Sequence, residues 1–392
     1  MTSLSRLLFG LLIAAVPLRP ASGPNLLLAQ ATAQSSAATA TDFSRLVARL
    51  SEDGGFFASD NLVSNETSYL HALDGFRTHG VKGGAYIGVG PEQGFSYIAE
   101  LEPRVAIILD IRRDNMVLHL LLKAMFETAR NRLEYLGLLY GLPVPEDAYL
   151  WTEHDLPSLL DYLDRTPADS ALHRRQQLAL MRRVEGYGIP LTEADRAAVR
   201  AFHDEFAAAG LDLRYAARGR PSRFSFPSER QLYLETDLEG NFGSYLSTEV
   251  RWRRVRDLHR ANRIIPVVGD LSGPTAVRAV GRYLREINTP VSALYLSNVE
   301  SYLFRYGTFP DFVANLRTLP ITGRSVMVRS WFGRGAALPS TVAGHLSTQL
   351  LQSFESFLEM TRVPEQVEYW MLLDAGLPLR SPLTPTEVPP HD

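Results

Sequence analysis

Short continuous apolar runs alternate along the chain with stretches whose apolar residues recur at helical spacing. Runs at 83–91, 105–109, 264–270, 291–298 and 325–330 have the length and composition of buried strands. The stretches at 42–50, 91–101, 249–262, 275–286 and 309–319 place apolar residues three and four apart. This alternation predicts an α/β fold with a doubly wound, mostly parallel sheet.

The longest interruption of this alternation lies between the second and third predicted strands. Residues 131–223 are helical in pattern, irregular and rich in proline, which predicts a helical insertion too long for a simple loop. Residues 42–130 and 224–335 then form the two halves of the core domain. Residues 336–377 predict C-terminal helices, with one long helix over 342–360, and the proline-rich residues 378–392 predict a disordered tail.

The N-terminus has the pattern of an export signal. Arg6 precedes an apolar run at 7–16 that is too short to span a bilayer, and sites with small residues follow. We therefore expect a signal peptide at 1–31, a linker at 32–41 and a secreted or periplasmic protein. A misassigned start or a short apolar tail is the alternative, and the protein is then cytoplasmic. No second apolar stretch predicts a transmembrane span in the mature chain.

Composition narrows the possible partners and chemistry. The chain has 392 residues, 45% of them hydrophobic, and a net charge of -3. Such a charge favours a small-molecule ligand over nucleic acid, and it leaves the oligomeric state open. There is no cysteine, which excludes disulfides, zinc thiolates and a thiol nucleophile.

A glycine turn after the first predicted strand is the strongest motif. Gly88 and Gly90 are suited to a tight turn into a helix, where the backbone closely approaches a phosphate or a similar group. Asp110 follows twenty residues later at the end of the second strand, where an acid commonly binds ribose hydroxyls. A structural turn without a ligand is the alternative.

Polar residues end two further strands, at Asp270 and Asn298. Since parallel strands place their carboxyl ends at one edge, we expect Asp110, Asp270 and Asn298 to face one crevice. Capping of the following helices is the alternative, and Asp270 fits it well. Ser64 is predicted to cap a helix over 66–76.

With these features the chain resembles the class I S-adenosylmethionine-dependent methyltransferases, over 83–113 and 264–330. The resemblance implies a Rossmann-like fold and S-adenosylmethionine as the cofactor, bound through Gly88, Gly90, Asp110 and Asp270. It also suggests that Asn298, Glu300 or Tyr302 orients an acceptor and that Glu66 serves as a base. The chain is further similar to an uncharacterised bacterial family marked by GVGPEQ at 88–93, DIRR at 110–113 and VVGD at 267–270.

Two departures from the methyltransferase pattern matter. Tyr86 stands where the family usually has an acid, and Gln93 stands near the place of a third glycine. An exported protein would also lack S-adenosylmethionine, which is a cytoplasmic metabolite. The alternative function is therefore an exported, non-catalytic binding protein with a degenerate Rossmann-like fold. A crevice filled by Tyr86, Gln93 or the insertion favours this alternative.

Other motifs are weak. The sequence lacks a Gly-x-Ser-x-Gly elbow, a Walker loop and a His-Glu-x-x-His pair. The triplet Glu153-His154-Asp155 is typical of a turn with a helix cap, although a metal role stays open. The basic stretch 251–256 favours a solvated helix face with Trp252 and Val255 inward over an anion site.

Overall fold

A computed structural model describes residues 42–380, except 60–61, 218–224, 334–337 and 339. The predicted signal peptide, the linker and most of the predicted tail lie outside these residues. None of the helices in the described part is both long enough and apolar enough to cross a membrane.

The core of the described residues is one six-stranded sheet, and the apolar runs predict five of its strands. Its strands are β1 (Ala85–Gly88), β2 (Val105–Asp110), β3 (Ile264–Val268), β4 (Val291–Tyr295), β5 (Val326–Trp331) and β6 (Thr348–Ser353). Their order is β3-β2-β1-β4-β5-β6, and only β6 runs antiparallel to its neighbour. The α/β class and the mostly parallel sheet are confirmed, and the arrangement is consistent with a Rossmann-like fold.

Burial explains why these runs form strands. Every residue of β1 to β4 is buried, so continuous apolar sequence is favoured over alternation. Pro266 is tolerated because β3 lies at the edge of the sheet. Gly84, just before β1, has a φ of +60°, and a Cβ there would lie 2.7 Å from the carbonyl oxygen of Pro290.

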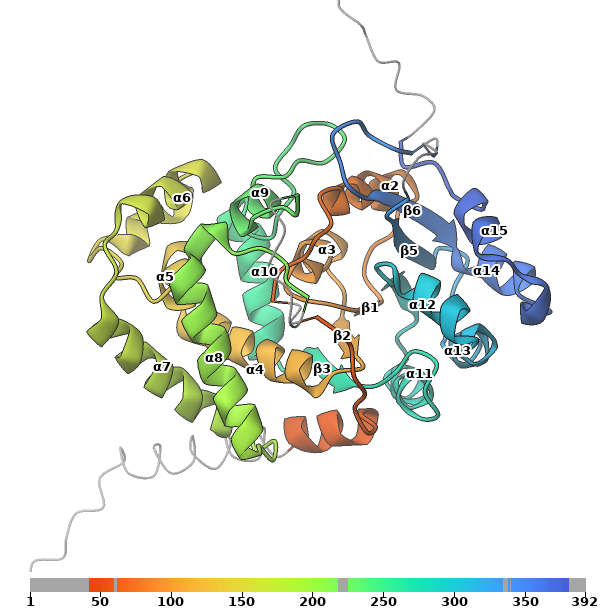
Figure 1. The fold of residues 1–392 in the computed structure, drawn as a ribbon, viewed down its shortest axis with the longest axis horizontal. Coiled ribbons are helices and arrows are strands. Elements are labelled where there is room, and N and C mark those ends of the chain that lie inside the picture. Colours follow the sequence, from red (N-terminus) through yellow and green to blue (C-terminus); the bar gives the residue numbers. More distant parts are fainter. Residues whose placement is uncertain (1–41, 60–61, 218–224, 334–337, 339, 381–392) are drawn as a thin grey trace, which may run out of the picture.

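Helices cover both faces of the sheet (Figure 1). One face carries α3 (Gly94–Leu101), α4 (Arg113–Thr128) and α10 (Glu249–Arg260). The other carries α11 (Ala276–Glu286), α12 (Val299–Tyr306) and α13 (Phe309–Leu316), with α14 (Phe354–Met360) and α15 (Tyr369–Asp374) beside them. In α10 the predicted inward residues Trp252 and Val255 are fully buried, and Arg251 and Arg253 pair with Glu100 and Glu249, so the basic stretch is a helix face.

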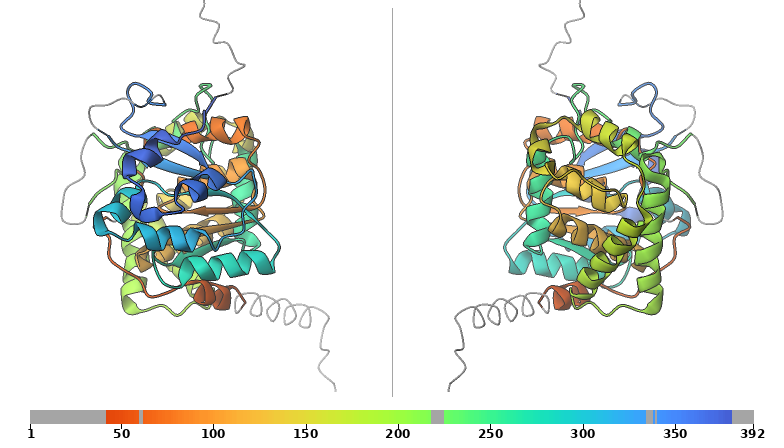
Figure 2. Two further views of the ribbon diagram at one scale, coloured as in Figure 1. Left: turned by 90° about the vertical axis from the view of Figure 1, so that its right-hand side faces the viewer. Right: turned by 90° about the vertical axis from the view of Figure 1, so that its left-hand side faces the viewer.

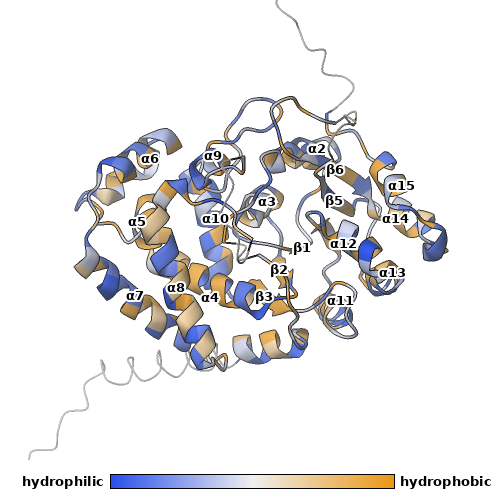
Figure 3. Ribbon diagram, in the orientation of Figure 1, coloured by the Kyte–Doolittle hydropathy of each residue, from blue (hydrophilic) through white to orange (hydrophobic). Residues whose placement is uncertain are grey.

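Further helices lie between β2 and β3 in the sequence. They are α5 (Arg132–Leu139), α6 (Leu156–Arg165), α7 (Ser170–Glu185), α8 (Glu193–Ala209) and α9 (Glu229–Tyr233), with the 3-10 turns η2 (Ala148–Glu153) and η3 (Gly210–Asp212). The right-hand view of Figure 2 shows α5 to α8, in yellow and green, as an outer layer. Helices α7 and α8 pack on α4, and Figure 3 shows hydrophilic and hydrophobic residues mixed along α7.

The N-terminal helix at 42–50 is confirmed, with Phe43, Val47 and Leu50 buried. The predicted helix over 66–76 begins later than expected. Ser64 does accept a hydrogen bond from the backbone N–H of Glu66, 3.1 Å away, but η1 (Tyr69–His71) and α2 (Ala72–Thr78) start only at Tyr69. Residues 67–68 form a turn, and the side chain of the preceding Glu66 is buried.

The predicted long helix over 342–360 is wrong. Residues 348–353 form β6, and only 354–360 are helical. The spacing of Leu346, Leu350 and Phe354 fits a helix, but β6 satisfies the exposed edge of β5 with a full antiparallel ladder. Gln349 and Gln352 are fully buried in this strand and bond to side chains of the core.

Candidate functional site

The candidate site lies at the edge of the sheet where the parallel strands end. Asp110 is the last residue of β2, and its carbonyl oxygen accepts a hydrogen bond from the N–H of Gly269, just after β3, over 2.9 Å. Asn298 follows β4, on the other side of β1. The fold thus brings Asp110 and Asp270 close together and places Asn298 further along the same edge.

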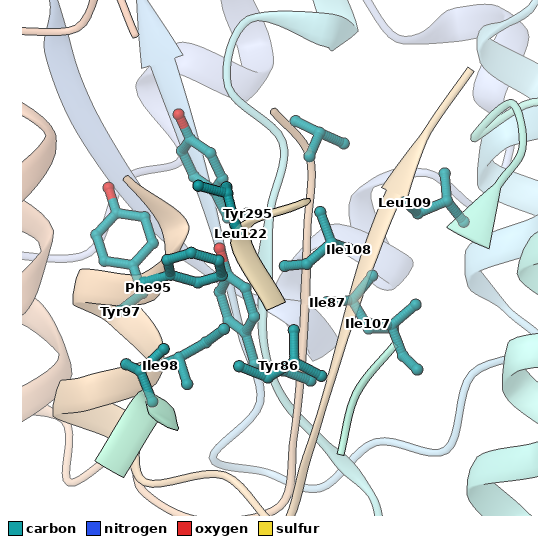
Figure 4. Close-up of a cluster of buried hydrophobic side chains, with 14 of the residues drawn as sticks. Tyr86, Ile87, Phe95, Tyr97, Ile98, Ile107, Ile108, Leu109, Leu122 and Tyr295 are labelled. Carbon is teal, nitrogen blue, oxygen red and sulfur yellow. The ribbon is translucent and has the colours of Figure 1, made fainter. Parts of the chain in front are cut away.

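Tyr86 occupies the space at the predicted glycine turn. A Cβ on Gly88 would lie 2.2 Å from the Tyr86 hydroxyl oxygen, and one on Gly94 would lie 3.1 Å from it. Tyr86 is fully buried, and Figure 4 shows it gathered with Tyr97 and Tyr295 beside β1. Its hydroxyl has no hydrogen-bond partner in the described part of the chain. Gly88 therefore makes room for a side chain of the protein itself.

Gly90 provides the actual turn. Its φ is +89°, a conformation that favours glycine, and its carbonyl oxygen lies 3.0 Å from Nε2 of the buried His119. Burial lowers the pKa of His119 to about 4. The ring is therefore neutral at physiological pH and fixes the turn through a neutral hydrogen bond.

Glu92 and Gln93, which follow Pro91 after the turn, point into two buried polar networks. Glu92 accepts hydrogen bonds from Tyr233, Tyr245 and Tyr135 over 2.6, 2.8 and 3.2 Å. Gln93 donates to the hydroxyl of Tyr295 over 3.1 Å. Sequence analysis missed Glu92, although an acid within an otherwise apolar stretch is a usable signal.

Glu92 is linked through the Tyr233 hydroxyl to a second buried acid, Glu229. The Tyr233 hydroxyl lies 2.6 Å from Glu92 and 2.8 Å from Glu229, yet it carries a single proton. One of these two contacts therefore needs a proton from a carboxyl group. Burial, strengthened by the neighbouring Glu92, raises the pKa of Glu229 well above its ordinary value, which keeps this acid protonated.

Asp110 is engaged by its own loop. Its Oδ1 accepts a hydrogen bond from the N–H of Arg112 over 2.9 Å and lies 3.4 Å from Nε of the same arginine. Arg112 is buried and also donates to the carbonyl oxygen of Ser59 over 2.7 Å. The carboxylate predicted to bind ribose thus faces an arginine that ties the N-terminal segment to the sheet.

That N-terminal segment, residues 51–59, runs across the ends of β2 and β3. The N–H of Glu52 bonds to the carbonyl oxygen of Val268 over 2.9 Å, and that of Gly55 bonds to Ile111 over 2.7 Å. A Cβ on Gly55 would lie 2.7 Å from the Ile111 side chain. The segment therefore covers the residue that follows Asp110.

Glu52 provides the negative charge at the loop after β3. Its carboxylate accepts hydrogen bonds from the N–H groups of Asp270, Thr275 and Ala276 over 2.8–3.0 Å, at the start of α11. Burial opposes its ionisation, but these bonds outweigh burial and lower the pKa of Glu52. Asp270 itself accepts bonds from the N–H and hydroxyl of Ser272 within the loop. The N-cap of α11 is Thr275, so Asp270 does not cap the following helix as the alternative predicts.

Glu66 is the centre of a polar network that we call the Glu66 cluster. The cluster comprises Glu66, Gln93, Tyr295, Ser297, Ser330 and Gln349. Glu66 is 1% exposed, and its Oε2 accepts hydrogen bonds from Tyr295, Ser330 and Gln349 over 2.6, 2.5 and 3.2 Å. Its Oε1 accepts a bond from Ser297. Burial, then the adjacent Glu66, raises the pKa of Tyr295 well above its ordinary value, so this hydroxyl remains a donor.

The cluster reaches the surface at the end of β4. Ser297 and Asn298 are both partly exposed, and Ser297 has a φ of +51°, an uncommon backbone conformation for serine. Tyr302 is half-buried, and its ring meets that of Phe57 edge-on at 5.2 Å. Ser297 thus connects the buried Glu66 to the partly exposed end of β4.

Glu300, the remaining predicted site residue, is part of an ion pair in the core. Its carboxylate lies 2.5 and 3.1 Å from Nε and an Nη of Arg329, and both side chains are 1% exposed. Arg329 also donates to Gln352 and to the carbonyl oxygen of Leu372. Glu300 is thus fully engaged in holding α12 and the C-terminal helix against β5.

A separate surface cavity of about 490 Å³ lies by α6. Its lining includes Trp151, His154 and Tyr162, and the rings of Trp151 and His154 stack at 4.5 Å. Asp155 caps α6 through the N–H of Ser158, which confirms the predicted cap.

Comparison with known proteins identifies the family. The chain matches the model described as Domain of unknown function (DUF7790) over residues 62–142 and 179–375, which is more than half of its length. It therefore belongs to this family. No curated protein matches it. The match includes the Glu66 cluster, whereas the cavity by α6 lies within the unmatched residues 143–178.

Proposed function

We propose that this member of the DUF7790 family is an exported binding protein whose nucleotide crevice is filled by its own residues. The observation that carries the proposal is the Tyr86 ring, which occupies the space at Gly88 and Gly94. In a nucleotide-binding turn, the glycines leave this space for the ligand.

The fold underlying this proposal is a Rossmann-like domain of the methyltransferase type with a helical insertion at 131–223. Support comes from the strand order, with five parallel strands and a final antiparallel one. Helices α7 and α8 form a second layer outside α4, as an insertion would. In contrast, α10 packs on both α3 and α4, in the place of a regular crossover helix.

The residues at the edge do not fit S-adenosylmethionine. Gly88 faces Tyr86, and Asp110 faces Arg112. The loop at Asp270 receives the carboxylate of Glu52, and residues 51–59 cover Ile111. Each place at which the resemblance expects the cofactor is thus engaged by the chain itself, and we derive no methyl-transfer step.

A small polar ligand would instead bind at the end of β4. Ser297 and Asn298 are partly exposed there, and Ser297 bonds directly to the buried Glu66. Tyr302 and Phe57 supply an aromatic side to the same place. A ligand with hydrogen-bond donors and a flat apolar face suits these groups.

Calorimetric titration with S-adenosylmethionine tests the proposal. We expect no heat of binding for the wild-type protein or for Asp110→Ala, because the crevice is filled. Binding by the wild type that is lost in Asp110→Ala would contradict the proposal and favour the alternative, an S-adenosylmethionine-dependent methyltransferase.

Export is tested separately by fractionation of the producing cells. A shortened chain outside the cytoplasm is the expected result, since residues 1–31 have the pattern of a signal peptide. An unprocessed chain in the cytoplasm would contradict the exported part of the proposal.

A further inference from the structure

Three metal-ligating side chains from distant parts of the sequence converge beside the Glu66 cluster. His71 ends η1, Glu235 follows α9, and His345 lies in the loop before β6. Their ligand atoms all lie within 4.8 Å of one another. Nε2 of His345 lies 3.3 Å from Oε1 of Glu235, and the two imidazole rings meet edge-on at 4.6 Å.

We propose that His71, Glu235 and His345 bind a divalent transition-metal ion of the Zn²⁺ or Co²⁺ type. This inference is independent of the proposed function, because none of the three residues fills the nucleotide crevice. Two imidazoles and one carboxylate are a common set of protein ligands for such ions, and they leave coordination positions open. Imidazole ligands disfavour Mg²⁺ and Ca²⁺, which prefer oxygen.

The distances are close to those of a bound site. Two ligands of one ion, each at about 2.1 Å, lie at most about 4.2 Å apart. The observed separations exceed this limit by about 0.6 Å at most. The side chains of His345 and Glu235 are 18% and 19% exposed, so small rotations of these two can close the site around an ion.

One ring nitrogen of the group also lacks a partner within the described part of the protein. Nδ1 of His345 is buried and has no hydrogen-bond partner among the described residues.

In a neighbouring acidic group, by comparison, an arginine already occupies the place of a cation. Asp74, Asp237 and Glu239 also bring their carboxylate oxygens within 4.8 Å of one another. Arg77 already supplies a cation there, 2.7 Å from Asp237 and 3.5 Å from Asp74. In the His71 group, by contrast, His345 is the only side chain among the described residues that forms an ion pair with Glu235.

The proposed metal site is connected to the Glu66 cluster by hydrogen bonds. The hydroxyls of Ser68 and Ser347 lie 2.8 Å apart, and Gln349 reaches both Ser68 and Glu66 over 3.4 and 3.2 Å. The segments that carry His71 and His345 thus also carry members of the cluster. An ion that holds these segments together would stabilise the cluster.

The test uses the purified mature protein, treated with a chelator and titrated with Zn²⁺ by calorimetry and with Co²⁺ by visible absorption. We expect one equivalent to bind and the melting temperature to rise with added Zn²⁺. Glu235→Gln and His345→Gln should each weaken binding at least about tenfold. These positions are chosen because the buried His71 is more sensitive to substitution.

The matched control is His154→Gln, which removes an exposed histidine that does not belong to the His71 group. Its affinity for Zn²⁺ should equal that of the wild type. The proposal is overturned if the wild type binds no ion, or if the Glu235 and His345 variants bind as tightly as the wild type. Equal weakening in His154→Gln would likewise overturn it, because the ion would then bind elsewhere.

Discussion

Glu66 and Glu300 are both 1% exposed, yet the protein stabilises their carboxylates in opposite ways. Glu300 faces the guanidinium of Arg329 in a bidentate ion pair. Glu66 instead accepts bonds from the neutral donors Tyr295, Ser297, Ser330 and Gln349. Burial alone therefore does not distinguish a structural carboxylate from one that is suited to a site.

The difference lies in what each carboxylate can still do. A proton or a ligand at Glu300 would leave the charge of Arg329 buried without a partner, which is costly. A proton or a ligand at Glu66 displaces only neutral hydrogen bonds, and Ser297 connects Glu66 to the partly exposed edge. Glu66 is thus the better candidate for binding or chemistry.

The largest effect is expected for Arg329→Met. Removing the guanidinium leaves Glu300 as an uncompensated buried charge, so the free energy of unfolding should fall by about 3–5 kcal/mol. Urea unfolding at pH 7 measures it. The double variant Arg329→Met with Glu300→Leu should recover much of this loss, and a double variant as unstable as the single one would argue against a structural ion pair.

Glu66→Gln should have a smaller effect. The amide retains the shape but replaces one acceptor with a donor, which faces the hydroxyls of Ser297, Ser330 and Tyr295. We expect the free energy of unfolding to fall by about 1–3 kcal/mol, less than for Arg329→Met. Glu286→Gln, in an exposed pair with Arg49, is the control and should change little. A loss for Glu66→Gln that equals the loss for Arg329→Met would remove the distinction between the two glutamates.

The acids Glu92 and Glu229 represent a third case, a buried pair in which Glu229 stays protonated. Their pKa values are raised in the folded state, chiefly by burial. At a pH above 4.5, the ordinary pKa of a glutamate, the unfolded chain therefore releases protons that the folded protein still holds. Stability from these groups is present at lower pH and is lost as the pH rises toward the folded pKa.

Glu229→Gln removes one of these proton-linked contributions. The melting temperature of this variant should therefore fall less steeply than that of the wild type as the pH rises above the ordinary carboxyl pKa of 4.5. The buried histidines have lowered pKa values and contribute equally to both proteins, so the difference between the two pH profiles isolates the acid pair. Parallel profiles would mean that Glu229 is not protonated in the folded protein.

The smallest expected effect concerns Tyr86. Its buried hydroxyl has no partner among the described residues, so Tyr86→Phe removes an unsatisfied polar group without changing the packing of the ring. Stability should be unchanged or rise by about 1 kcal/mol, as measured by urea unfolding. A clear loss of stability would show that the hydroxyl is hydrogen-bonded in solution.

The sequence predicts the core of the fold well because burial on both faces produces continuous apolar strands. In β2 and β3, for example, the pattern of apolar residues indicates a strand and no other element. The strand β6 could not be predicted, because its apolar spacing also fits a helix and only the open edge of β5 selects a strand. Likewise, Ser64 looks like a helix cap, and the inward direction of Glu66 depends on residues more than 200 positions away.

The site was predicted only in part for a similar reason. The spacing of glycines and acids correctly indicates the strand ends. It carries no information about side chains from other parts of the chain that pack against these ends. Glu52 and Tyr86 occupy places that the motif assigns to a ligand, and Glu52 reaches α11 from the other end of the chain. The histidine pair at 71 and 345 is similarly invisible to local patterns.

Above all, we propose that the chain itself closes the edge of the sheet at which a nucleotide would bind. Hydrogen exchange of the backbone amides of Glu52 and Gly55, which bond to Val268 and Ile111, tests it most directly. We expect strong protection of both amides in the purified protein and no change when S-adenosylmethionine is added. Rapid exchange of both amides, or a change in their exchange on addition of S-adenosylmethionine that Asp110→Ala abolishes, would contradict it.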